Sequence, residues 1–189
     1  MAASYEPDPE TRAAVARLAG TELLLVALDF DGTLAQLQDD PMASRMLPAA
    51  REAVETLAAT PDTVVALVSG RSLVDLRVTA EHDDSSRIVL AGSHGAEYWF
   101  ADEGLVSHGE DAADVTLRDA MRAHAEQANR LTDAIVSAEA PHWRRRTGHN
   151  IVEYAFRQEG KDTAVAELRA RAGATAVLFA GDDVTDEDA

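Results

Sequence analysis

The sequence of 189 residues predicts an α/β fold, a doubly wound parallel sheet with a small insert. Two observations predict it. Short apolar runs, typical of strands buried on both faces, alternate with segments of helical periodicity. Polar side chains come directly after several of these apolar runs. In open α/β sheets, ligands bind at the carboxyl ends of the strands. The predicted function therefore depends on those polar residues.

The first half of the chain predicts strands and helices in alternation. Six apolar residues, 23–28, directly precede Asp29. We expect the irregular loop 35–46 to lie next to the carboxylates that follow this strand, as a lid over a site. Pro48 is suited to the first turn of a helix, and Ser72 to the capping position of the next one. The expected strands are 23–28, 63–68 and 88–91, with an aromatic edge at 98–100, and the expected helices are 10–18, 48–59 and 72–80.

The second half predicts an insert followed by the return of the core. Glycines at 104 and 109 indicate a turn over 102–110, and Pro141 ends a long helical pattern. The further expected elements are a helical stretch at 111–139, a basic patch at 142–149, strands at 151–156 and 176–180, and a helix at 161–171. The expected domains are a lead-in at 1–21, a first core part at 22–100, a reduced cap at 101–150 and a second core part at 151–189, with the C-terminal end of the core missing.

Composition excludes several classes of partner. The apolar fraction is 46% and the charged fraction 27%, as in ordinary globular proteins, and no run approaches the ~20 apolar residues of a membrane span. A net charge of −17 argues against nucleic acid and against anionic membranes. No apolar signal segment and no cysteine are present. We expect a cytoplasmic monomer that acts on a small molecule.

The polar residues after the strands share one chemistry. Several carboxylates forced together repel one another unless a hard cation lies among them, and oxygen ligands of this kind suit Mg²⁺. One ammonium and one hydroxyl complete a phosphoryl-binding set, in which one carboxylate can be a nucleophile and another a general acid and base. The candidate residues are Asp29, Asp31, Ser69, Lys161, Asp182, Asp183 and Asp186.

Each candidate also has a structural alternative. An aspartate after a strand is often a helix cap or a turn residue, and Ser-Gly is common in turns. Lys161 could be an ordinary helix residue, although it is the only lysine beside sixteen arginines. The order of the whole set favours function.

The motifs resemble those of a known superfamily. Asp29-Phe30-Asp31-Gly32-Thr33, Ser69-Gly70-Arg71, Lys161 and the run from Gly181 to Glu187 are similar in order to the four motifs of haloacid dehalogenase-type phosphatases. The run from Gly92 to Glu97, together with Gly-Asp-Asp-Val-Thr-Asp-Glu-Asp, resembles the trehalose-6-phosphate phosphatase family more narrowly. The resemblance covers residues 22–100 and 148–189 and implies a haloacid dehalogenase-like core.

The resemblance also implies a role for each matching residue. Asp29 would form an aspartyl-phosphate, and Asp31 would protonate the departing sugar oxygen and then activate water. Ser69 would bind a phosphoryl oxygen, and Lys161 would neutralise Asp29. The implied Mg²⁺ ligands and their supports are Asp29, the backbone carbonyl of Asp31, Asp182, Asp183 and Asp186. The implied sugar-binding residues are Arg71, His94, Gly95, Glu97 and, in the cap, Glu153.

The chain departs from that pattern in three places. The cap is reduced and contains no lysine, the chain ends directly after the fourth motif, and Asp162 follows Lys161 where the family has glycine. The main hypothesis is a Mg²⁺-dependent trehalose 6-phosphate phosphatase of trehalose biosynthesis. Two alternatives stay open: the same chemistry on another sugar phosphate, and a truncated remnant that binds Mg²⁺ or phosphate without turnover.

Overall fold

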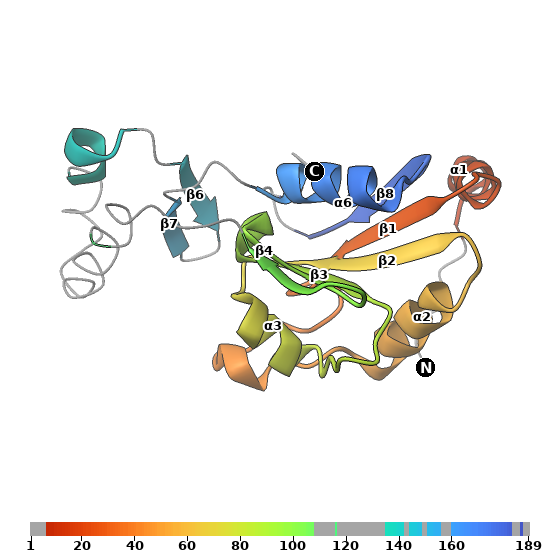
Figure 1. Ribbon diagram of the computed structural model, residues 1–189, viewed down its shortest axis with the longest axis horizontal. Coiled ribbons are helices and arrows are strands. Elements are labelled where there is room, and N and C mark those ends of the chain that lie inside the picture. Colours follow the sequence, from red (N-terminus) through yellow and green to blue (C-terminus); the bar gives the residue numbers. More distant parts are fainter. Residues whose placement is uncertain are drawn as a thin grey trace.

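The computed structural model describes residues 7–107, 116, 135–141, 144–148, 151–155, 160–182 and 186. These residues build a three-layer core around a six-stranded sheet of order β5-β4-β3-β2-β1-β8 (Figure 1). The predicted α/β class is thereby confirmed. Among the described residues, no helix is long and apolar enough to cross a membrane.

The strand order contains the change of direction that defines a doubly wound sheet. β1 (Leu24–Asp29) pairs in parallel with β2 (Thr63–Val68), which pairs in parallel with β3 (Val89–Gly92). The chain later returns to the other side of β1, where β8 (Ala176–Ala180) pairs with it, again in parallel. The topological switch point, where open α/β sheets bind ligands, therefore lies between β1 and β8.

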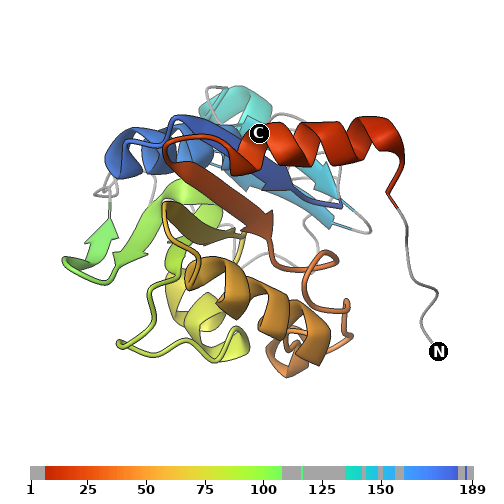
Figure 2. The ribbon, with the colours of Figure 1, turned by 90° about the vertical axis from the view of Figure 1, so that its right-hand side faces the viewer.

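Helices cover both faces of this sheet. α2 (Pro48–Ala58) and α3 (Leu73–Thr79) lie on one face and α6 (Lys161–Ala172) on the other, while α1 (Pro9–Ala19) packs beside β8 (Figure 2). One buried cluster lies on each face, with Phe30, Val54 and Leu76 in the first and Ala164 and Leu168 in the second. Strands β1 and β2 contribute to both clusters, as expected for apolar runs buried on two faces.

Local signals fix where the helices begin and end. The Ser72 hydroxyl accepts a hydrogen bond from the Asp75 N–H at 3.2 Å and caps α3 as predicted, and α2 begins at Pro48. The Thr163 hydroxyl accepts from the Gly160 N–H at 2.7 Å at the start of α6, and Gly173, with φ +66°, ends that helix.

The prediction of a turn over 102–110 is wrong for its central residues. Gly104–Ser107 forms β5, the edge strand of the sheet, and pairs antiparallel with β4 (Glu97–Phe100). Four residues are too few to show alternation, so the strand is defined by its partner rather than by its own pattern. Residues 101–103 form a turn, and residues 108–110 lie outside the described residues.

Another correction concerns residues 144–155. Arg144–Gly148, predicted only as part of a basic patch, forms β6 and pairs with β7 (Ile151–Ala155) in a separate two-stranded sheet (Figure 1). β7 was expected in the second core part, but its pairing partner is β6. Three consecutive arginines gave β6 no apolar alternation to reveal it. The division of the chain into domains stays a prediction.

Part of the expected helical stretch at 111–139 lies outside the described residues. Residue 116 and residues 135–139 are helical. His142, His149 and Asp183 also lie outside the described residues.

Truncating a buried leucine should destabilise the fold far more than truncating an exposed one. Leu90 of β3 is fully buried, whereas Leu37 is 67% exposed. We expect Leu90→Ala to lower the free energy of unfolding by about 2–5 kcal/mol, because it leaves a cavity in the core. Leu37→Ala, the matched control, should change it by less than about 0.5 kcal/mol. Urea denaturation measures both, and equal losses would contradict the assigned core.

Candidate active site

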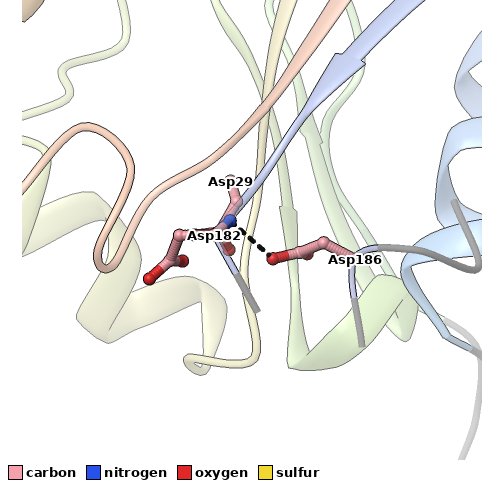
Figure 3. Close-up of side chains that lie close together, drawn as sticks. All are labelled: Asp29, Asp182 and Asp186. Atoms are coloured by element: carbon pink, nitrogen blue, oxygen red, sulfur yellow. Dashed lines mark hydrogen bonds between the residues drawn. The ribbon is translucent and has the colours of Figure 1, made fainter. Parts of the chain in front are cut away.

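Three carboxylates meet at the switch point of the sheet. Asp29 is the last residue of β1, and Asp182 follows the end of β8 by two residues, with Asp186 just beyond (Figure 3). One oxygen from each side chain lies within 4.8 Å of the others. The Asp182 N–H also donates to Asp186 Oδ2 at 3.1 Å. The structure thus brings together three of the acids that the sequence predicted as one site.

The only lysine of the chain lies among these acids. Lys161 is the first residue of α6, and its side chain is buried. Its Nζ donates to Asp29 Oδ1 and to Asp186 Oδ1, both at 2.5 Å. Burial alone would lower the pKa of Lys161, but the nearby Asp29 and the hydrogen bonds to both carboxylates raise it overall. The ammonium therefore stays charged and holds α6 to β1.

Asp29 is destabilised as a carboxylate in spite of this partner. Burial raises the pKa of Asp29 to about 6; Lys161 opposes this shift, and Asp186 and Asp182 add to it. Its Oδ2 is buried and has no hydrogen-bond partner among the described residues. An unpaired, buried oxygen of this kind is costly, which indicates that another group interacts with it in the working protein.

Two glycines allow the acids to come this close. A Cβ on Gly32, where φ is +91°, would lie 1.9 Å from Asp182 Oδ2, so the Asp182 carboxylate rests on the backbone that follows Asp31. A Cβ on Gly181 would lie 2.2 Å from Asp186 Cγ. No side chain fits at either position without displacing an acid.

Asp31 points to a different partner. Arg71 donates from Nε to Asp31 Oδ2 and from Nη2 to Oδ1, both at 2.6 Å, in a two-pronged ion pair. These hydrogen bonds raise the pKa of Arg71. The Ser44 hydroxyl, from the loop 35–46, also lies 3.4 Å from Asp31 Oδ1. The sequence interpretation missed Ser44 and the pairing of Arg71 with Asp31.

Ser69 lies beside Asp29 because of strand register. Asp29 pairs with Val68, the residue before Ser69, across β1 and β2. Ser69 is buried, and its Oγ accepts from the Arg71 N–H at 3.2 Å. The hydroxyl therefore stands at the same edge of the sheet as the three acids.

The segment Gly92–Glu97 contacts the Ser69–Arg71 loop. The His94 N–H donates to Ser69 O at 3.0 Å, and Gly95 is buried against α6. Glu97 Oε2 accepts from the Leu73 N–H at 3.0 Å and from the Ser93 hydroxyl at 2.7 Å. Glu153 belongs to β7 in the separate two-stranded sheet. The roles predicted for these residues at the sugar stay predictions.

The donor set suits a divalent cation. Three carboxylates facing one ammonium leave an excess of two negative charges in a largely buried space. The donors are oxygens only, and one of them, Asp29 Oδ2, lacks a partner among the described residues. This chemistry fits Mg²⁺, which binds one or two carboxylates and retains waters or phosphate oxygens.

A cavity of about 330 Å³ lies elsewhere, between α2 and the loop that leads into β3. Val54, Leu67 and His82 are among its lining residues, and none of the predicted site residues lines it. The candidate site is therefore identified from its charged side chains and not from this cavity.

The chain is similar in sequence to known proteins. A family model described as trehalose-phosphatase matches residues 27–139. An uncharacterised glycosyl hydrolase of Mycobacterium tuberculosis is 41% identical over 110 residues, which are 58% of this chain and 8% of that protein. The trehalose-phosphate phosphatase of Mycobacterium avium is 32% identical over 205 aligned positions, covering 87% of this chain and 50% of that protein. The chain thus spans half or less of the length of these relatives.

Solved structures share the fold. The C-terminal domain of a trehalose-6-phosphate phosphatase of C. albicans matches with a TM-score of 0.78 at 17% identity, covering 97% of this chain and 78% of that chain. A haloacid dehalogenase-like hydrolase of B. subtilis matches with a TM-score of 0.64 at 12% identity, covering 87% and 85%. The predicted haloacid dehalogenase-like core is confirmed.

The raised pKa of Asp29 predicts a pH dependence of stability in the metal-free protein. Between about pH 4 and 6 the folded state binds more protons at Asp29 than the unfolded state does, so the contribution of Asp29 to stability falls as the pH rises through this window. The loss is on the order of 3 kcal/mol, since one pKa unit is worth about 1.4 kcal/mol.

Urea unfolding with a chelator from pH 4 to 7 measures this effect. Asp29→Asn should remove that part of the slope, whereas Asp62→Asn, at an exposed acid before β2, should keep it. Parallel profiles for the wild type and Asp29→Asn would show that the pKa is not raised.

Proposed function

Because the chain belongs to the trehalose-phosphatase family, we propose that it is a Mg²⁺-dependent phosphatase that hydrolyses trehalose 6-phosphate to trehalose and phosphate. The observation that carries this proposal is the buried contact of Lys161 with Asp29 and Asp186, with Asp182 beside them. A lone ammonium among three acids suits a site that neutralises a phosphoryl group.

In the first step the Asp29 carboxylate attacks phosphorus, and the bond between phosphorus and the sugar oxygen breaks. Lys161 holds Asp29 Oδ1, fixes the direction of the carboxylate and offsets charge that gathers on the phosphoryl oxygens. Ser69 lies at the same edge of the sheet, and its hydroxyl donates a hydrogen bond to a phosphoryl oxygen. The product of this step is an aspartyl-phosphate on Asp29.

Asp31 handles the protons. It gives a proton to the departing sugar oxygen, then takes one from the water that hydrolyses the aspartyl-phosphate and frees Asp29. Both Asp31 oxygens accept from Arg71 in this structure, so at least one must be released before it can carry a proton. A phosphate dianion competes for the same guanidinium, which supports release on substrate binding.

Mg²⁺ would be held by Asp29 and Asp182, with Asp186 and the Asp31 backbone carbonyl close by, and the family resemblance adds Asp183 to this set. When bound, the ion supplies positive charge that orients and neutralises the phosphoryl oxygens. The Asp182 carboxylate lies against Gly32, the residue that follows Asp31, and this contact supports the assignment.

The sugar side of the site rests on the family resemblance. We assign Arg71, His94, Gly95 and Glu153 to it as proposals. The resemblance also implies Glu97 there, but Oε2 of Glu97 already accepts from the Ser93 hydroxyl and the Leu73 N–H. We also propose a monomer in the cytoplasm, with a small sugar phosphate as its substrate. The net charge of −17, which disfavours nucleic acid and anionic membranes, supports this choice of partner.

Replacing the nucleophile should abolish hydrolysis. We expect Asp29→Asn to lower kcat for trehalose 6-phosphate, with Mg²⁺ present, by about three orders of magnitude or more, because an amide cannot form the intermediate. Asp62→Asn, an acid-to-amide change at the opposite end of β2 from the site, should leave kcat unchanged. Phosphate release measures both, and unchanged turnover in Asp29→Asn would sink the mechanism.

The wild-type protein tests the substrate in the same assay. Faster release from another phosphorylated sugar than from trehalose 6-phosphate would favour the alternative substrate. Absence of release from every sugar phosphate, with Mg²⁺ binding retained, would favour the non-catalytic alternative.

Mg²⁺ should stabilise the folded protein through Asp182. At a hundred times its dissociation constant the ion adds about 2.7 kcal/mol, which is a rise in Tm of roughly 5–10 °C for a chain of this size. Asp182→Asn should lose most of that rise, and Asp62→Asn should keep it. Thermal unfolding with and without Mg²⁺ measures the shift, and an equal rise in Asp182→Asn would remove Asp182 from the metal site.

A further inference from the structure

The Gly92–Glu97 segment contacts two parts of the candidate site, the Ser69–Arg71 loop and the helix α6. On one side, the Ser93 N–H donates to Arg71 O at 2.5 Å and the His94 N–H to Ser69 O at 3.0 Å. A Cβ on Gly70 would lie 2.7 Å from His94 Nε2, so the imidazole rests on the backbone between Ser69 and Arg71. The segment therefore holds both residues of the loop through its own backbone.

On the other side the same segment contacts the helix that carries Lys161. A Cβ on Gly95 would lie 2.7 Å from the Ala164 Cβ. Ala164 is buried and lies one turn after Lys161 on α6. Any displacement of the segment is thus felt by the Ser69–Arg71 loop and by α6 together.

This segment adopts a backbone that costs free energy. Ser93 has φ +50° and His94 has φ +56°, a region that side chains other than glycine rarely adopt, and Gly95 follows with φ +95°. Two such residues in succession strain the backbone, so surrounding contacts must fix them.

The Glu97 side chain makes contacts that fix this strained segment. Its Oε2 accepts from the Ser93 hydroxyl at 2.7 Å and from the Leu73 N–H at 3.0 Å. Leu73 is the first residue of α3 and follows Arg71 by two residues. One carboxylate oxygen therefore joins the strained segment to the end of the Ser69–Arg71 loop, and hydrogen bonds to a charged acceptor of this kind are the strong ones.

We propose that Glu97 is a positioning residue for the phosphoryl-binding loop, acting through Ser93 and Leu73, and that it does not contact the sugar. Its activity readout rests on the proposed phosphatase function. A sugar contact would require the carboxylate to face the substrate, whereas Oε2 is engaged by two protein donors. The loop that Glu97 holds carries Ser69, which in the proposed function binds the phosphoryl group whatever its leaving group is.

Two substrates separate these roles. Trehalose 6-phosphate has the sugar, and p-nitrophenyl phosphate lacks it. We expect Glu97→Ala to lower kcat/KM for both by the same factor, on the order of tenfold to a hundredfold, since two charge-assisted hydrogen bonds are lost. A loss confined to trehalose 6-phosphate would overturn the proposal.

The conservative variant gives a second criterion. In Glu97→Gln the amide oxygen can take the place of Oε2 and still accept from both the Leu73 N–H and the Ser93 hydroxyl, so we expect most activity to return for both substrates. Glu52→Ala, at an exposed glutamate of α2, is the matched control and should have no effect. Assays well below each measured Tm exclude simple unfolding, and failure of the glutamine variant to rescue would count against the proposal.

Two further readouts do not need turnover. Calorimetric binding of inorganic phosphate with Mg²⁺ should weaken in Glu97→Ala but not in Glu52→Ala. Amide hydrogen exchange at Leu73, Ser93 and His94 should quicken in the alanine variant only. A wild type that hydrolyses neither substrate would defeat the proposed function alone, and unchanged exchange at these three amides would defeat the role of Glu97 whether or not phosphate binds.

Discussion

The candidate site depends on one buried ammonium. Lys161 Nζ bonds Asp29 on the strand β1 and Asp186 beyond β8, and so joins α6 to both sides of the topological switch point. Asp29 has a carboxylate oxygen within 4.8 Å of those of two other acids. Among the described residues, Lys161 is the cationic side chain that the structure pairs with Asp29. With it, the site still keeps an excess of negative charge. The charge of Lys161 allows the three acids to lie together in the folded protein. The negative charge that remains suits the binding of a cation together with a phosphoryl group.

The elements that the sequence predicted well are those whose burial is set locally. β1 and β2 are buried on both faces and show unbroken apolar runs, while α2 and α3 carry their own start signals in Pro48 and Ser72. β5 and β6 were missed because an edge strand of four or five residues has no required alternation. Each is a strand because β4 or β7 lies beside it, and a single sequence does not state which segments will pair.

For the site, the sequence predicted which acids gather but not which partners they choose. Parallel strands end at one edge, so Asp29 and Asp182 had to be neighbours once β1 and β8 were recognised. Nothing in the pattern indicated that Arg71 would fork onto Asp31, or that Ser44 would reach it from the loop 35–46. The direction of a loop side chain is decided by packing from distant segments. The hydrogen bonds of Glu97 with Ser93 and Leu73 could not be predicted either. The chain between Ser93 and Glu97 turns through two residues of positive φ, His94 and Gly95, and the sequence pattern does not show that turn.

The separation of 132 residues between Asp29 and Lys161 has a consequence for the growing chain. At roughly 5–20 residues per second, translation supplies the ammonium about 7–26 s after the carboxylate. During that interval β1 can pair with β2, but its other edge has no β8, and an uncovered apolar edge strand invites pairing with other chains. Asp29 must also stay hydrated, because closing the core over an unpaired charge is costly. The nascent β1 therefore exposes one apolar edge and one unpaired carboxylate until α6 and β8 arrive to cover them.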